Sequence, residues 1–250
     1  MIISLVSFLG VFTIIVLVHE LGHFIAARRA GIKIYEFSIG FPFSPRIATL
    51  FQHRETEFTL RLLPLGGFVS FSKGDESEVI ELFEAPRLHR AVIMAAGSLA
   101  NIAFAFLIFI PVFVFGKHLP FMDAVLVSAK TVWSVLSGVV MFFAQLITGN
   151  GTMDGLTGPV GIASLAGKAA AKGILHVMFF TGMLSLSLGI LNLLPLPALD
   201  GGQLLMLMIE SIRRKRLSLR AHQLTNLIGL FLFLALTIVA TYRDIIKIVS

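Results

Sequence analysis

The chain has 250 residues, of which 56% are hydrophobic and 14% charged, and its mean hydropathy is +0.92. These values exclude an ordinary soluble domain and indicate a polytopic membrane protein. There is no cysteine, which excludes disulfides and thiolate metal sites, so a bound metal would need His, Asp or Glu as ligands. In such a chain the net charge of +6 indicates basic cytoplasmic loops rather than a nucleic-acid partner.

Apolar stretches long enough to cross the hydrocarbon core, about 20 residues as a helix, predict four transmembrane helices. They cover residues 3–27, 91–116, 174–199 and 223–242. A fifth stretch, 124–148, contains Lys130 and several Ser and Thr residues, so it either crosses the membrane or lies in its interface. We interpret it as an outer-leaflet interfacial helix. The predicted fold is an all-α polytopic membrane protein with one domain over residues 1–250.

Residues 56–71 show a different pattern, in which apolar and polar side chains alternate. Phe58, Leu60 and Leu62 alternate with polar neighbours, the chain turns between Pro64 and Gly67, and apolar residues then resume. This pattern predicts a β-hairpin with an apolar tip. We expect the hairpin to dip into the membrane from the cytoplasm; a solvent-side hairpin packed on its neighbours is the alternative.

The distribution of Lys and Arg predicts how the chain is oriented in the membrane. Nine lie between the first and second predicted spans and five lie in residues 213–220, whereas residues 117–173 contain four. By the positive-inside rule the two basic loops face the cytoplasm, and both termini lie outside. The first and third spans then run in the same direction and end at the same membrane face.

The first predicted span ends with the pattern H-E-x-x-H, formed by His19, Glu20 and His23. Residues i and i+4 share one face of a helix, so both imidazoles can reach one metal ion while Glu20 stands near its bound water. Ionisable groups at membrane depth are expensive and are usually functional or paired. Three of them within five residues therefore favour a metal site over a helix end that merely meets lipid headgroups.

Zinc needs a third protein ligand and an open position for water. Asp200 is the candidate, because it lies at the cytoplasmic end of the third predicted span. Pro195 and Pro197 precede it and predict locally unwound backbone, and the following glycines, Gly201 and Gly202, predict a tight turn. If Asp200 shares a metal with the histidines, residues 124–148 cannot by themselves reverse the direction of the third span.

With these motifs the chain resembles the site-2 protease family of intramembrane zinc metalloproteases, and within it the bacterial regulator-of-sigma-E type branch that cleaves anti-sigma factors. The resemblance covers nearly the whole chain, and its segments are HELGH (19–23), GIKIYEFSIGF (31–41), RLLPLGGFVSF (61–71), GSLAN (97–101), TGPVGIA (157–163) and NLLPLPALDGG (192–202). Ser98 stands where the family pattern G-P-x-A-N has proline. Members of this branch usually carry PDZ domains between the second and third spans, whereas only residues 116–123 separate the second span from the interfacial stretch here. The chain is either a minimal member or one whose domain was removed, and selection of substrates by a PDZ domain is expected to be absent.

The resemblance implies the roles of the site residues. It implies that His19, His23 and Asp200 bind one zinc ion, that Glu20 is the catalytic base and that Asn192 helps to bind substrate. The unwound segment and the hairpin complete the expected substrate-binding set, which comprises Asn192, Pro195, Pro197, Gly66, Gly67 and Phe68.

The predicted function is that of a zinc-dependent endoprotease in the bacterial cytoplasmic membrane, with its active site open toward the cytoplasm. We expect it to cleave peptide bonds in or near transmembrane segments, as in regulated intramembrane proteolysis of anti-sigma factors or in the removal of cleaved signal peptides. A transporter or ion-conducting protein would also place His, Glu and Asp in spans, but it should show inverted repeats of hydropathy, and we find none. A non-catalytic scaffold would lack one of the four zinc-site residues, and all four are present.

Overall fold

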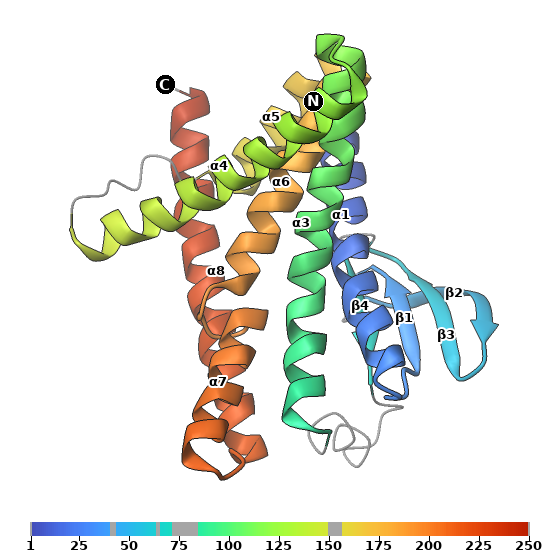
Figure 1. Cartoon of the computed structure of the whole chain (residues 1–250), viewed down its shortest axis with the longest axis vertical. Coiled ribbons are helices and arrows are strands. Elements are labelled where there is room, and N and C mark those ends of the chain that lie inside the picture. The colour runs from blue at the N-terminus through green and yellow to red at the C-terminus, as the bar shows by residue number, and fades with distance from the viewer. Residues whose placement is uncertain (1, 41–43, 64–65, 72–84, 150–156, 250) are drawn as a thin grey trace.

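The computed structural model describes residues 2–40, 44–63, 66–71, 85–149 and 157–249 (Figure 1). Its helices are α1 (Ile2–Arg29), α3 (Arg87–Lys117), α4 (Phe121–Ile147), α5 (Pro159–Lys172), α6 (Ile174–Leu193), α7 (Asp200–Arg213) and α8 (Leu219–Val249). Its strands are β1 (Glu36–Ile39), β2 (Arg46–His53), β3 (Thr56–Arg61) and β4 (Gly67–Ser70). The fold is therefore mostly helical with a small sheet, which the prediction of an all-α protein with a single hairpin understated.

Helices α1, α3 and α6 pack together in alternating directions. His23 of α1 contacts Ile93 of α3 and His19 contacts Asn101, so α1 and α3 are antiparallel. Asn101 of α3 also accepts a hydrogen bond from Ser185 of α6, and Phe109 lies against Phe179, so α3 and α6 are antiparallel as well. Helices α1 and α6 consequently run in the same direction, as a metal shared between their C-terminal ends requires. Both chain termini lie at one end of the bundle (Figure 1).

Within the described part of the chain, five helices are long and apolar enough to cross a membrane. Four of them, α1, α3, α6 and the segment Arg220–Ile246 of α8, correspond to the predicted spans. The fifth is the segment Phe121–Gln145 of α4, which runs obliquely across the bundle in Figure 1. The chain is thus a multi-pass membrane protein.

Helix α6 ends at Leu193, six residues before the predicted boundary at 199. Leu194 is extended, with φ −66° and ψ 144°, because the ring of Pro195 disfavours helical backbone in the preceding residue. The chain resumes as helix α7 at Asp200, which the sequence analysis did not predict. The unwound backbone predicted from the two prolines is the connection between these helices.

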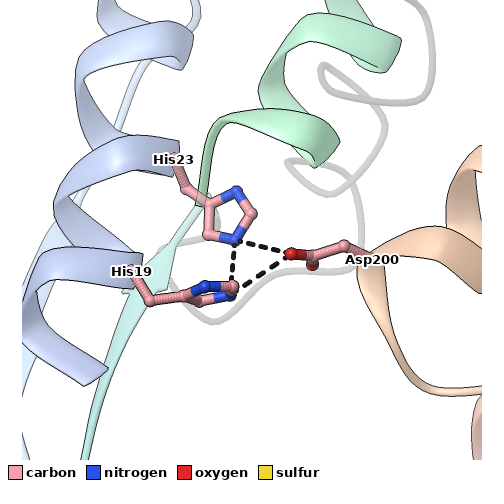
Figure 2. Close-up of side chains that lie close together, drawn as sticks. All are labelled: His19, His23 and Asp200. Atoms are coloured by element: carbon pink, nitrogen blue, oxygen red, sulfur yellow. Dashed lines mark hydrogen bonds and ion pairs between the residues drawn. The ribbon is translucent and has the colours of Figure 1, made fainter. Parts of the chain in front are cut away.

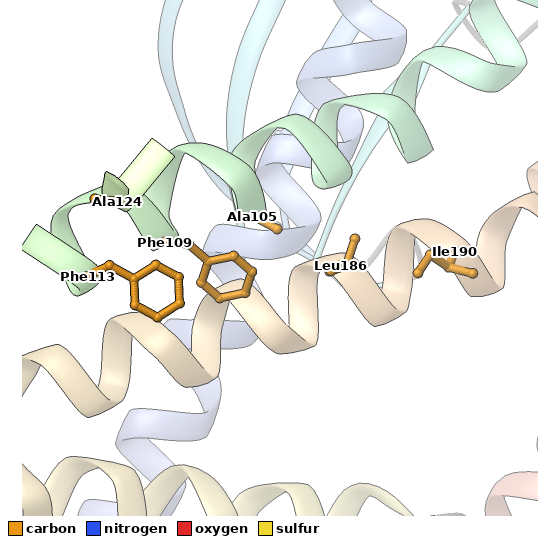
Figure 3. Packing of buried hydrophobic residues seen from close by; sticks show 6 residues of the cluster. All are labelled: Ala105, Phe109, Phe113, Ala124, Leu186 and Ile190. Carbon is orange, nitrogen blue, oxygen red and sulfur yellow. The ribbon is translucent and has the colours of Figure 1, made fainter. Parts of the chain in front are cut away.

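The interior of the bundle is formed where α3 packs against α6. Figure 3 shows its buried residues, which come from α3, α4 and α6 and are Ala105, Phe109, Phe113, Ala124, Leu186 and Ile190. Glycines on α6 allow close approach, since a Cβ atom on Gly182 would lie 2.5 Å from the Phe109 ring and one on Gly189 would lie 2.8 Å from a backbone oxygen of α3. Small residues at helix contacts are typical of membrane bundles, whose association depends on close van der Waals packing.

The four strands form one sheet in the order β2-β3-β1-β4. Strand β1 pairs in parallel with β3 and antiparallel with β4, while β2 and β3 form the antiparallel hairpin. The predicted hairpin over 56–71 is therefore wrong in its pairing, although both of its strands exist. Strand β1 occupies the position between β3 and β4 because Phe37 packs against Phe24 of α1 and Phe58 of β3. Residues 64 and 65 of the predicted tip lie outside the described residues.

The sheet packs on the C-terminal half of α1. A buried cluster joins α1, β1 and α3, and its members are Phe24, Ala27, Ile34, Phe37 and Ile93. Strand β4, at the end of the sheet, lies against α1, because a Cβ atom on Gly67 would lie 3.3 Å from Leu17 and 3.5 Å from the Glu20 side chain. This packing brings one edge of the sheet to the H-E-x-x-H segment.

A buried ion pair joins α3 to α7. Arg90 donates to Glu210 over 2.9 Å, and each side chain is only 1% exposed. The backbone amide of Leu217 donates to the other oxygen of Glu210 at 3.0 Å, and His222 lies 3.3 Å from that oxygen. These contacts connect α7, the helix that begins with Asp200, to both α3 and α8.

Candidate metal centre

His19 and His23 lie one turn apart on the inner face of α1, as their spacing predicts (Figure 2). Their Nε2 atoms are 3.1 Å apart, and the rings meet edge to face. The Nδ1 atom of His23 is 2.7 Å from the carbonyl oxygen of Ile93. A carbonyl only accepts hydrogen bonds, so Nδ1 carries the proton and the Nε2 lone pair is free to bind a metal.

Asp200 reaches the two imidazoles from the first turn of α7. Its Oδ2 lies 3.2 Å from Nε2 of His19 and 3.5 Å from Nε2 of His23 (Figure 2). The predicted trio is thus brought together, and its ligand atoms all lie within 4.8 Å of one another. Bonds of 2.0–2.1 Å to a tetrahedral zinc ion imply ligand atoms about 3.3 Å apart. The observed separations and the donor set of two imidazoles and one carboxylate fit that ion.

The connection from α6 holds Asp200 by unusually close backbone contacts. A Cβ atom on Gly201 would lie 2.2 Å from the carbonyl oxygen of Leu194, and one on Gly202 would lie 2.1 Å from that of Leu196. Both glycines are helical, so the tight turn predicted for them is wrong, and their role is close approach. Ala198 adopts φ 67°, a left-handed conformation rarely taken by residues other than glycine. Such backbone persists where surrounding packing over-determines it, commonly at functional sites.

Helix α3 contacts every member of the trio, a role for this helix that was not predicted from the sequence. In addition to the Ile93 contact with His23, Ser98 donates a hydrogen bond to Oδ2 of Asp200 at 3.2 Å, and the amide of Asn101 lies 3.5 Å from Nδ1 of His19. Gly97 permits this approach, because a Cβ atom there would lie 2.3 Å from Nε2 of His23. The signal for these contacts in the sequence is the segment GSLAN (97–101), which contains Gly97, Ser98 and Asn101.

We call His19, His23 and Asp200 the metal trio. Glu20, the predicted base, lies half-buried between this trio and strand β4. Its carboxylate accepts a hydrogen bond from the backbone amide of Val69, and its side chain lies beside Gly67 of the same strand. The carboxylate therefore connects the metal trio to the edge of the sheet.

The predicted substrate-binding residues lie on both sides of this centre. Gly67 and Phe68 belong to β4, and Gly66, with φ 107°, precedes them. Asn192 lies half-buried in the last turn of α6. Pro195 is exposed and Pro197 half-buried in the connection that leads to Asp200, where Pro197 packs closely against Gly229 of α8.

In this membrane bundle a helix with the H-E-x-x-H pattern and a distant aspartate place their ligand atoms close enough to bind one metal ion. This arrangement defines a membrane-embedded metallopeptidase. The chain belongs to peptidase family M50, whose sequence profile matches residues 7–236. The zinc metalloprotease RasP of Geobacillus kaustophilus is 26% identical over 98% of each chain. A putative zinc metalloprotease of Agrobacterium fabrum is 25% identical over 98% of this chain and 96% of its own. The regulator of sigma-W protease RasP of Bacillus subtilis is 38% identical over 52% of this chain and 32% of its own.

These relationships confirm the predicted enzyme class. The protein is an intramembrane zinc metalloprotease of the site-2 protease family, related to its regulator-of-sigma branch, and zinc is its cofactor. They favour this class over a transporter or an ion-conducting protein. The alignments with the first two relatives extend over 416 and 365 positions, more than the 250 residues of this chain, so those relatives contain sequence without a counterpart here.

Proposed function

We propose that His19, His23 and Asp200 are the zinc ligands and Glu20 the general base of an endoprotease that hydrolyses peptide bonds in or near transmembrane segments. The convergence of the three ligand atoms, separated by 3.1, 3.2 and 3.5 Å, carries this proposal. The two histidines of α1 and Asp200 of α7 lie about 180 positions apart in the chain. Their nitrogen and oxygen donors suit zinc.

Each of the four side chains then has a defined task. Zinc, when bound, lowers the pKa of a water molecule toward neutrality and polarises the scissile carbonyl. Glu20 accepts a proton from the attacking water and passes it to the leaving amine. The Val69 amide orients the Glu20 carboxylate for this exchange. Water reaches the site from the cytoplasmic end of α1, near Arg28 and Arg29.

Strand β4 supports a mode of substrate binding. A transmembrane helix hides its peptide bonds in i to i−4 hydrogen bonds, so cleavage needs an extended segment. Among the described strands β4 pairs with β1 alone, and it lies beside Glu20. An unwound substrate adds to β4 as a further strand, next to Gly66, Gly67 and Phe68. Asn192, in the last turn of α6, and Pro195 and Pro197, in the α6–α7 connection, contact it from the other side.

The placement in the membrane follows from the charge distribution. The basic segments that flank the metal trio face the cytoplasm of a bacterial cell, and both termini lie outside the cytoplasmic membrane. Helix α4 then lies in the outer interface, which its oblique course across the bundle favours (Figure 1). Four helices, α1, α3, α6 and α8, cross the bilayer.

The substrates proposed here are anti-sigma factors or cleaved signal peptides. The name of the Bacillus subtilis relative, regulator of sigma-W protease, supports the first of these. The residues proposed to act on them all lie in one catalytic unit within residues 1–250.

Zinc determination combined with a cleavage assay tests the proposed roles. The full chain and its Glu20→Gln variant, purified in detergent, should each contain about one zinc ion, and only the wild type should cleave a model transmembrane substrate. Full cleavage by Glu20→Gln would exclude Glu20 as the base, and absence of zinc from the wild type would exclude the ligand set.

A further inference from the structure

The metal trio is surrounded by partners from a single helix. Ile93 accepts from His23 at 2.7 Å, Ser98 donates to Asp200 at 3.2 Å, and Asn101 contacts His19 at 3.5 Å. Partners of this kind commonly orient metal ligands, and their loss weakens metal affinity. Of these partners, Asn101 is the one with a side-chain atom, Oδ1, whose hydrogen-bonding capacity is unused among the described residues.

The geometry of His19 defines what Asn101 must supply. Nε2 of His19 faces Nε2 of His23 and Oδ2 of Asp200, so it is the nitrogen that offers a lone pair to an ion. A neutral imidazole then carries its proton on Nδ1, which needs an acceptor. The group at Nδ1 is the side-chain amide of Asn101, a fully buried residue.

The Asn101 side chain contains an acceptor that needs a donor, as the Nδ1 proton of His19 needs an acceptor. Its Nδ2 faces Nδ1 of His19, which places two donors against each other when Nε2 binds a metal. Its Oδ1 is buried and finds no hydrogen-bond partner among the described residues. The oxygen and nitrogen of an amide exchange places by a half-turn, and the hydrogen-bond network decides between the two orientations. The half-turn gives Oδ1 the partner it lacks.

We propose that Asn101 is a positioning residue of the metal centre, whose amide oxygen accepts the Nδ1 proton of His19 and fixes the tautomer that presents Nε2 to the ion. Complete burial keeps Asn101 away from substrate, and Ser185 of α6 anchors its backbone carbonyl at 3.0 Å. Helix α3 then serves both histidines alike, with the Ile93 carbonyl at His23 and the Asn101 amide oxygen at His19. The inference rests on the proposed ligand set.

Measurement of zinc affinity distinguishes whether Asn101 acts as a hydrogen-bond acceptor for His19 or only as a packing residue. The full chain in detergent is titrated with zinc against a chromophoric chelator, together with Asn101→Leu and Asn101→Asp. Removal of the acceptor in Asn101→Leu should weaken zinc binding about 10- to 100-fold. Asn101→Asp retains an oxygen acceptor and should bind zinc within about threefold of the wild type or more tightly, because carboxylate partners raise the basicity of the imidazole. Asn226→Leu, the same change on α8 at a residue paired with Gln203, is the control and should keep wild-type affinity.

Two outcomes of this titration overturn the proposal. They are wild-type affinity in Asn101→Leu, and equal weakening in the Leu and Asp variants. His19→Ala is measured in parallel, because wild-type zinc affinity in that variant would reject the ligand set itself. A zinc-deficient His19→Ala beside an unaffected Asn101→Leu rejects the Asn101 assignment alone.

A measurement on the wild type needs no folded variant. Nitrogen-15 spectra of zinc-free, histidine-labelled protein at mildly alkaline pH, where imidazoles are neutral, report the tautomer of each ring. Asn101 should hold His19 with its proton on Nδ1 before any metal binds. A His19 ring protonated on Nε2 in that state would overturn the proposal.

Discussion

Replacement of Gly97 by alanine should damage the metal centre while leaving the bundle folded. The added methyl carbon would lie 2.3 Å from Nε2 of His23 and 2.8 Å from Cε1 of His19. Carbon and nitrogen atoms in contact need about 3.5 Å, so α1 and α3 must separate by roughly 1 Å at this point or the imidazoles must turn away. A displacement of about 1 Å in a catalytic site lowers activity about 100-fold, and zinc affinity should fall with it.

Loss of helix propensity would not explain this result, since alanine is more favourable than glycine inside a helix by about 1 kcal/mol. Gly116→Ala is the matched control on the same helix, because a methyl group there meets Leu175 at an ordinary 3.6 Å. Zinc content after dialysis and cleavage of a transmembrane reporter are measured for both variants. Wild-type zinc content and activity in Gly97→Ala would show that the close approach of α3 to the two histidines is not required.

Two further changes test how α7 presents Asp200. Gly201→Ala puts a methyl group 2.2 Å from the carbonyl oxygen of Leu194, so Asp200 must move and zinc content should fall; an unchanged zinc content would contradict the close packing. Glu210→Gln removes the carboxylate charge that pairs with the buried Arg90 and should destabilise the fold by about 3–5 kcal/mol at neutral pH, measured by thermal unfolding in detergent. Burial raises the pKa of Glu210, but the Leu217 amide and the Arg90 charge outweigh it, so the pKa lies below its ordinary value. Stabilisation by this carboxylate is therefore complete above its ordinary pKa and is lost as the pH falls through the lower folded-state pKa. The difference in Tm between wild type and Glu210→Gln should narrow in acid, and a constant difference would argue against this role for Glu210.

The metal trio could be predicted from the sequence because it depends on the spacing of residues within one helix and on the direction in which each predicted span crosses the membrane. The spacing of His19 and His23 places both on one helix face whatever surrounds them. Asp200 followed from chemistry and direction, since zinc needs a third ligand and the first and third predicted spans end at the same face. The end of α6 was misjudged because Leu194 is apolar, although Pro195 carried the signal for an earlier boundary.

The remaining differences depend on contacts between distant segments. Alternation along residues 56–71 indicates strands but does not name their partners, and β1 takes the place between β3 and β4 through packing of Phe37. Gly201 and Gly202 disfavour a helix by propensity, yet they lie in the first turn of α7, where any larger residue would strike the preceding connection. The role of Asn101 likewise emerges only when α3 lies against α1.

Anomalous diffraction at the zinc edge from crystals of the zinc-loaded protein would locate the ion without reference to activity. We expect one peak about 2 Å from Nε2 of His19, Nε2 of His23 and Oδ2 of Asp200. A peak bound by other residues, or a trio without zinc in protein that still cleaves its substrate, would contradict the proposed ligand set.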